Sequence, residues 1–144
     1  MIRRAGPEDV HAIAALFRRS FGTLTFLPTL HTPEEDRAFF AGVLADGEVW
    51  AWDEDGRILG FSALRARELT HLYVEPEAQG RGIGRALLEH AKARRPDGLE
   101  LWLFQQNAGA RRLYDRQGFV LVRETDGSGN EEQAPDALLA WRPR

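Results

Sequence analysis

The stretch LTHLYVEPEAQGRGIGRALLEHAKAR, from Leu69 to Arg94, combines a strand, a glycine-rich loop and a helix, and it decides the fold. Leu69 to Val74 is a short apolar run bounded by a proline, which predicts a strand. From Ile83, apolar residues recur at i, i+3, i+4, i+7 and i+8, which predicts a helix with one buried face that ends before Pro96. Glycines at the alternate positions 80, 82 and 84 join the two elements.

This order of elements favours an anion-binding loop. Backbone N–H groups can point into one concavity only with unusual φ values and with no Cβ beside the ligand, and glycine meets both conditions. The positive end of the helix dipole adds attraction for phosphate. The G-x-G-x-G spacing is neither a dinucleotide fingerprint nor a P-loop, because Arg85 and Ala86 follow Gly84. Glycines that only tighten a strand-to-helix turn are the alternative.

Two motifs together resemble one enzyme family. Gln79, Gly82 and Gly84 fill the pattern Arg/Gln-x-x-Gly-x-Gly/Ala, which is similar to the acyl-CoA pyrophosphate loop of the GCN5-related N-acetyltransferases. The lead-in Leu72-Tyr73-Val74-x-Pro76 is also usual for that family. Downstream, Asn107-x-x-Ala110-x-x-Leu113-Tyr114-x-x-x-Gly118-Phe119 resembles its second signature, a helix with a tyrosine near its end followed by Gly-Phe. The two motifs in this order are more specific than either alone.

Length and composition limit the class of protein. The 144 residues suit one domain, residues 1–144, with a net charge of −3 that offers no basic field for nucleic acid. No run approaches the ~20 apolar residues that span a bilayer, and we see no signal peptide, so we expect a cytoplasmic protein with no membrane partner. A single lysine among 19 cationic residues suits a GC-rich bacterial genome. There is no cysteine for a disulfide or a covalent acyl intermediate.

The remaining local signals predict the order of elements. Pro7 opens a first helix that ends at Gly22, and Thr32 forms a capping box with Glu35 at the start of a second. The expected buried stripe of that second helix is Phe39, Phe40, Val43 and Leu44. Strands are expected at 1–4, 49–52, 58–64, 99–104, 119–123 and 138–141, with a hairpin turn at 54–56 and a helix capped by Asn107. With the resemblance, this order implies an α/β (α+β) fold: a mixed, largely antiparallel sheet flanked by about four helices.

The resemblance implies acetyl-CoA as co-substrate, held by the loop, by the strand before it and by the Asn107 helix. Gln79 and the side chains of Arg81 or Arg85 would lie near the pyrophosphate. The four histidines lack metal-ligand spacing, so we expect no metal. The residues expected to bind the cofactor are Leu72, Tyr73, Val74, Gln79, Gly80, Arg81, Gly82, Ile83, Gly84, Arg85, Asn107 and Tyr114.

Tyr114 matches the residue usually assigned as general acid in that family. A phenol of pKa ~10 that protonates a thiolate of pKa ~8.5 works against about 1.5 units, roughly 2 kcal/mol, so a relay is as reasonable as full transfer. Glu68 stands where some members place a catalytic glutamate, although a carboxylate of ordinary pKa ~4.3 is a weak base. His71 and a water chain are the alternatives to Glu68.

The acceptor is expected beside the apolar segment from Phe21 to His31, where the family lines its acceptor pocket. Phe26, Leu27 and His31 are the candidate residues, and insertion of the apolar ones into the core is an equal and compatible interpretation. The acidic stretch 124–135 is either a solvated loop or a rim that attracts a cationic amine.

The predicted function is acetyl transfer from acetyl-CoA directly to a primary amine of a small molecule or peptide. The alternative is a catalytically silent acyl-CoA-binding sensor. The sequence does not choose between monomer and homodimer.

Overall fold

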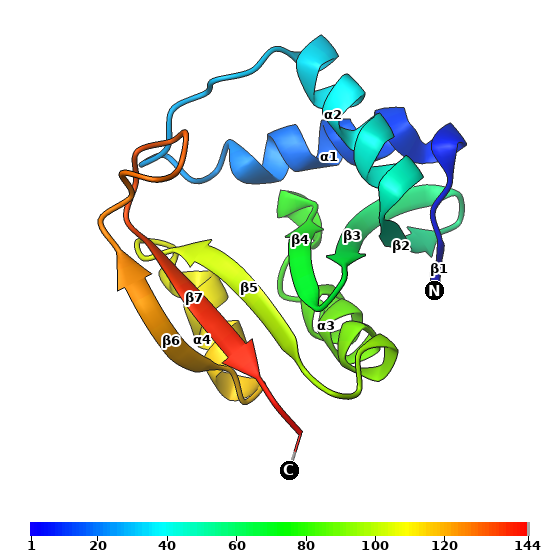
Figure 1. Ribbon diagram of the computed structural model, residues 1–144. Coiled ribbons are helices and arrows are strands. Elements are labelled where there is room, and N and C mark those ends of the chain that lie inside the picture. The colour runs from blue at the N-terminus through cyan, green and yellow to red at the C-terminus, as the bar shows by residue number, and fades with distance from the viewer. Residues whose placement is uncertain (144) are drawn as a thin grey trace.

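A seven-stranded sheet forms the centre of the molecule, in the order β1-β2-β3-β4-β5-β7-β6 (Figure 1). The computed structural model describes residues 1–143. Neighbouring strands are antiparallel except β4 and β5, which are parallel. The strands are β1 (Ile2–Arg4), β2 (Glu48–Glu54), β3 (Arg57–Arg65), β4 (Glu68–Val74), β5 (Leu99–Phe104), β6 (Val120–Thr125) and β7 (Asp136–Trp141). The predicted mixed, largely antiparallel sheet is confirmed.

Four helices cover the two faces of this sheet, as predicted: α1 (Val10–Phe21), α2 (Pro33–Asp46), α3 (Ile83–Arg94) and α4 (Ala108–Arg116). Successive residues of β3 show the division between the faces. Phe61 packs in the core cluster of α1 and α2, whereas a Cβ at Gly60 would meet Ile83 and Leu87 of α3. Helix α4 packs beside α3, with Tyr114 among the buried leucines of β5 and β7. None of the helices in residues 1–143 has the length and apolar character needed to span a bilayer.

The local signals of the sequence hold in detail. Thr32 Oγ1 accepts from the Glu35 amide at 3.1 Å, and the Glu35 carboxylate accepts from the Thr32 amide at 2.8 Å, which closes the expected capping box. Asp55 and Gly56 have φ values of 53° and 86°, the left-handed pair of a tight hairpin turn. The first helix differs from the prediction, because Pro7–Asp9 is a 3₁₀ turn and the α-helix begins only at Val10. The strands expected at 49–52, 58–64, 119–123 and 138–141 are each shifted or extended by one or two residues at their ends.

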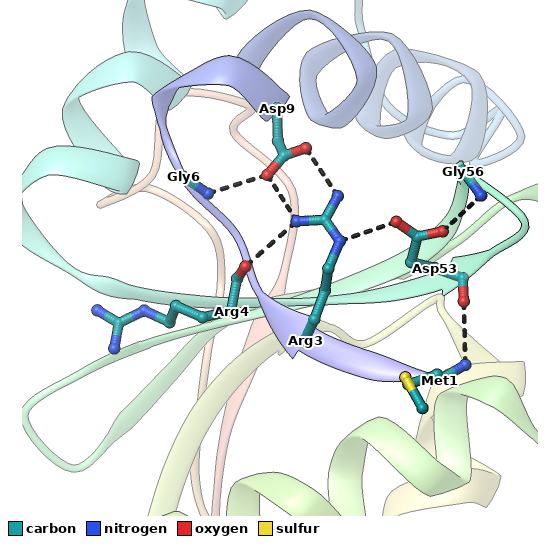
Figure 2. Close-up of polar contacts among 7 residues, drawn as sticks. All are labelled: Met1, Arg3, Arg4, Gly6, Asp9, Asp53 and Gly56. Carbon is teal, nitrogen blue, oxygen red and sulfur yellow. Dashed lines mark hydrogen bonds and ion pairs between the residues drawn. The ribbon is translucent and has the colours of Figure 1, made fainter.

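Arg3 fastens β1 to the rest of the fold (Figure 2). Its guanidinium donates to both carboxylate oxygens of Asp9, at 2.9 and 3.0 Å, and to Asp53 of β2 at 2.8 Å. Asp9 in turn accepts from the Gly6 amide, and Asp53 accepts from the Gly56 amide of the hairpin turn. One side chain therefore joins the start of α1 to the β2–β3 hairpin, and β3 pairs in turn with the central strand β4.

Strands β4 and β5 separate along their length. They pair only at Glu68 and Glu100, whereas β4 pairs with β3, and β5 with β7, from Glu68 to Val74 and from Leu99 to Phe104. The two strands are parallel and pair only near their starts. Their ends, at Val74 and Phe104, therefore lie apart (Figure 1). The edge of β4 that faces β5 therefore has no strand partner over residues 70–74.

Candidate active site

The loop between β4 and α3 presents bare backbone to open space. Gly80 and Gly82 both have φ of 83°, and Gly82 is the N-cap of α3. A Cβ built at either position would meet nothing within 4 Å. Within residues 1–143, the amides of Arg81 to Gly84 donate to no carbonyl or side chain. These free donors at a helix N-terminus form a concavity suited to an anion.

A cavity of about 550 Å³ extends from this loop along β4 to α4. It is lined by Ser20, Thr23, Leu24, Leu72, Tyr73, Val74, Ala78, Gln79, Gly80, Gly82, Ile83, Gly84, Arg85, Asn107, Gly109, Ala110, Leu113, Tyr114, Arg116 and Gln117. All the residues expected to bind the cofactor line it except Arg81. We call it the loop cavity.

Arg81 turns away from the loop cavity, where its guanidinium pairs with Glu54 of β2 at 2.8 Å. Arg85 faces the cavity, and its contact with Glu89 is a longer 3.6 Å. Arg116 at the end of α4 adds a second cationic side chain to the lining, which the sequence analysis missed. The motif locates Tyr114, but only the packing of α4 shows that Arg116, half a turn later, faces the same space.

The end of α1 also contributes to the loop cavity through Ser20, Thr23 and Leu24. A bidentate ion pair holds it there, with Arg19 Nε at 2.5 Å and Nη2 at 2.8 Å from the two carboxylate oxygens of Glu75. Glu75, which directly follows β4, is only 3% exposed. This contact spans 56 residues of sequence, so no local pattern could have predicted it.

A second cavity, of about 680 Å³, opens on the α1 and α2 side of the strand separation. Its lining combines aromatic side chains with acidic groups from α2 and from the loop between β6 and β7: Phe17, Arg18, Phe21, Gly22, Pro28, Thr29, Leu30, His31, Glu35, Asp36, Ala38, Phe39, Thr70, His71, Tyr73, Trp102, Phe104, Glu131 and Glu132. We call it the aromatic cavity. Among residues 1–143, Tyr73 is the one residue that lines both cavities.

Of the three residues expected at the acceptor, only His31 lines the aromatic cavity. Phe26 packs edge-on against Phe104, with 6.2 Å between the ring centres. It therefore contacts a residue that lines the aromatic cavity but does not line the cavity itself. Leu27 is half-buried and lines neither cavity. Phe39, expected in the core, is 56% exposed and faces the aromatic cavity instead.

The two candidate catalytic residues are not brought together. Tyr114 is 7% exposed, lines the loop cavity and packs against Phe119 at 5.4 Å. Burial raises the pKa of its phenol, and the nearby Tyr73 raises that pKa further. Glu68 is the first residue of β4, at the end where β4 and β5 meet; it is exposed and lines neither cavity.

His71 lies at the base of the aromatic cavity among Phe17, Phe40 and Phe61. Burial lowers its pKa to about 4, so the ring is neutral near pH 7. Thr70 Oγ1 donates to the Ala63 carbonyl at 3.2 Å and lies 3.0 Å from His71 Nδ1. Because that hydroxyl proton is already used, we assign the ring hydrogen to Nδ1, which leaves Nε2 with its lone pair.

Acidic groups border the mouth of the aromatic cavity. His31 Nε2 lies 2.9 Å from Glu131, which joins the segment before α2 to the loop between β6 and β7. That contact raises the pKa of His31. Arg18 pairs with the buried Asp36 at 2.7 Å, and Glu132 adds a further carboxylate. Within residues 1–143, no three acidic or histidine side chains gather as a metal site would need.

Comparison with known proteins places this geometry in a family. A family model described as an acetyltransferase (GNAT) domain matches residues 45–121. The chain is 39% identical to the peptidyl-lysine N-acetyltransferase YiaC of Escherichia coli over 68% of its length and 66% of that protein. It is 32% identical to the peptidyl-lysine N-acetyltransferase YjaB of Escherichia coli over 97% of its length and 95% of that protein.

Solved structures agree on the fold. The solution structure of apo-form YjaB from Escherichia coli superposes with a TM-score of 0.80 at 26% identity, covering 98% of this chain and 96% of that one. A PaiA N-acetyltransferase from Thermoplasma acidophilum, solved in complex with coenzyme A, superposes with a TM-score of 0.79 at 21% identity and covers 99% and 98% of the two chains.

Proposed function

The chain belongs to the GCN5-related N-acetyltransferase (GNAT) family, and from this premise we propose that it transfers an acetyl group from acetyl-CoA directly to a primary amine. The observation that carries the proposal is the loop cavity. Its free amides at Arg81 to Gly84, at the positive end of α3, suit the pyrophosphate of the coenzyme. Arg85 and Arg116 supply charge for the same anion.

The separated edge of β4 supports binding of the pantetheine arm. Between residues 70 and 74 this edge has no strand partner, so its amides and carbonyls can pair with the two amides of the arm as an added strand would. Leu72 and Val74 line the same cavity. The arm would thus be led toward Tyr73, where the two cavities meet.

Bound in this way, acetyl-CoA supplies an activated thioester. Tyr114 is the proposed acid toward the sulfur, because it is buried, lines the loop cavity and stays protonated near neutral pH. Asn107 caps α4, because its side-chain oxygen accepts a hydrogen bond from the Ala110 amide at 3.3 Å. Asn107 would lie beside the cofactor arm. We assign no step to Glu68, because it reaches neither cavity.

A strong base is not apparent at the proposed acceptor site. Two histidines line the aromatic cavity, and His31 is paired with Glu131. The pKa of His71, about 4, lies about six units below the ~10.4 of an alkyl amine. A millionfold unfavourable proton transfer cannot be an efficient first step. We propose that the amine is attracted to the acidic mouth as a cation, loses its extra proton to solvent there, and then donates a hydrogen bond to His71 Nε2 as the free base.

The proposed acceptor is the side-chain amine of a peptide lysine, because YiaC and YjaB are peptidyl-lysine N-acetyltransferases. The acidic mouth of the aromatic cavity supports this choice, since Glu131 and Glu132 would attract a cationic side chain. A small-molecule amine fits the same chemistry. With no cysteine in the chain, transfer would pass directly from the thioester to the amine.

The test measures thiol release from acetyl-CoA with lysine-containing peptides, with the same peptides bearing glutamine, and with small primary amines. We expect release only with the amines, and acetylation at the lysine nitrogen by mass spectrometry. Thermal stabilisation by CoA without any turnover would instead identify a silent acyl-CoA sensor. Neither stabilisation nor turnover would reject both functions.

A further inference from the structure

Among the described residues 1–143, Tyr73 alone lines both the loop cavity and the aromatic cavity. It lies near the end of β4, where that strand has left β5. Its ring is held by Phe17, 5.0 Å away edge-on, and by Phe61, 6.0 Å away and stacked. Within residues 1–143, its hydroxyl has no hydrogen-bond partner, so it is free to meet a ligand.

Tyr114 approaches the same junction from α4. It is the second buried phenol of the site, and its hydroxyl also lacks a partner among the described residues. Tyr73 raises the pKa of Tyr114, while Glu132 at the aromatic cavity adds to the burial that raises the pKa of Tyr73 to about 12. Tyr73 and Tyr114 both line the loop cavity, Tyr73 and Glu132 both line the aromatic cavity, and both phenols stay protonated near neutral pH.

Acetyl transfer to an amine requires a net movement of one proton from nitrogen to sulfur. The other titratable groups of the aromatic cavity are poorly suited to carry it. Asp36 is paired with Arg18, Glu131 with His31, and Glu35 caps α2. Glu132 has no ion-pair partner among residues 1–143, but it lies in the loop at the mouth and lines the aromatic cavity without reaching the loop cavity.

We propose that Tyr73 is a second catalytic tyrosine and that Tyr73 and Tyr114 together relay the proton, in contact or through one water. As the C–N bond forms and the C–S bond breaks, the amine proton passes to the Tyr73 oxygen. The Tyr73 proton passes to the Tyr114 oxygen, and the Tyr114 proton passes to the departing sulfur. Each phenol gives one proton and receives one, so neither becomes charged in a site where burial opposes charge. The relay rests on the proposed acetyltransferase function.

The decisive experiment compares the wild type with Tyr73→Phe, Tyr114→Phe and the double variant. Phenylalanine keeps the ring and removes only the oxygen, so CoA affinity and melting temperature should be retained. Breaking a relay at either point stops it, so we expect each single change to lower kcat about 10²-fold and the double change to lower it no further. Tyr73→Phe with unchanged kcat, or a double loss near the product of the singles, would overturn the relay.

A measurement on the wild type keeps the test independent of the variants. If two or more protons move together, kcat should fall along a bowl-shaped curve as the deuterium fraction of the water rises, and a straight line would overturn the relay. Arg57→Gln, which changes an exposed side chain that lines neither of these two cavities, is the control, and we expect it to keep both kcat and KM for the amine. Wild-type protein that binds CoA but acetylates no amine would refute the proposed function itself. If only the relay proposal were wrong, the wild type would still acetylate an amine.

Discussion

At the scale of single residues, the clearest prediction concerns Gly82. Its φ of 83° strains any residue with a Cβ, and the methyl group of alanine would point into the space proposed for the pyrophosphate. We expect Gly82→Ala to lower the free energy of unfolding by about 1–2 kcal/mol. We also expect it to weaken CoA binding by about tenfold or more, through displacement of the diphosphate from the amides. Denaturant unfolding and calorimetric titration with CoA measure the two effects.

Gly56 provides a matched control on the same chain. It has φ of 86°, open space around its absent Cβ and a place in the β2–β3 turn that lines neither cavity. Gly56→Ala should therefore cost similar stability and leave the CoA dissociation constant unchanged. An equal loss of CoA affinity in both variants would mean that strain, rather than the loop, explains the result.

At the scale of elements, the junction of α1 with the end of β4 depends on one buried contact. Arg19→Gln would leave the carboxylate of Glu75, 3% exposed, without its guanidinium partner. We expect a loss of about 2–3 kcal/mol in the free energy of unfolding, because an unpaired buried charge is costly. CoA affinity should also fall, since the end of α1 and the turn after it supply Ser20, Thr23 and Leu24 to the loop cavity.

The ion pair of Arg57 with Glu77 provides the comparison. Glu77 lies two residues after Glu75, and Arg57 is the first residue of β3. Both side chains are more than 60% exposed, so Arg57→Gln should cost less than about 1 kcal/mol and leave CoA binding unchanged. If the two arginine variants were equally stable, burial of Glu75 would not be the source of the junction's strength.

The same elements show what the sequence could predict. Thr32 with Glu35, the Asp55-Gly56 turn and the Asn107 cap act within a few residues, so the order of the helices and strands follows from local pattern, with ends that differ by up to three residues. The motif likewise located the loop. The separation of β4 from β5 has no local signal, because it depends on which strands pair beyond Glu68. The resemblance to the family suggested Glu68 for the site, whereas Tyr73 is the residue of β4 that lines both cavities among the described residues.

At the scale of the whole molecule, two buried groups should make the fold sensitive to acid in different pH ranges. Burial lowers the pKa of His71 from 6.5 to about 4. Burial tends to raise the pKa of Glu48, but hydrogen bonds from Arg94 and Trp50 and the charge of Arg95 outweigh it and lower the pKa from 4.5 to about 2. Both pKa values are lower in the folded state than in the unfolded state, so in both cases the unfolded chain binds the proton first.

Stability should thus be complete above about pH 6.5 and fall in two stages as the pH decreases. The His71 contribution is lost between pH 6.5 and about 4, and the Glu48 contribution between pH 4.5 and about 2. Each shift of about 2.5 units corresponds to a change on the order of 3 kcal/mol in the free energy of unfolding. Urea unfolding at a series of pH values should show that His71→Gln flattens the upper stage and Glu48→Gln the lower. If either variant kept the wild-type slope in its own range, the corresponding group would not be responsible for the acid sensitivity.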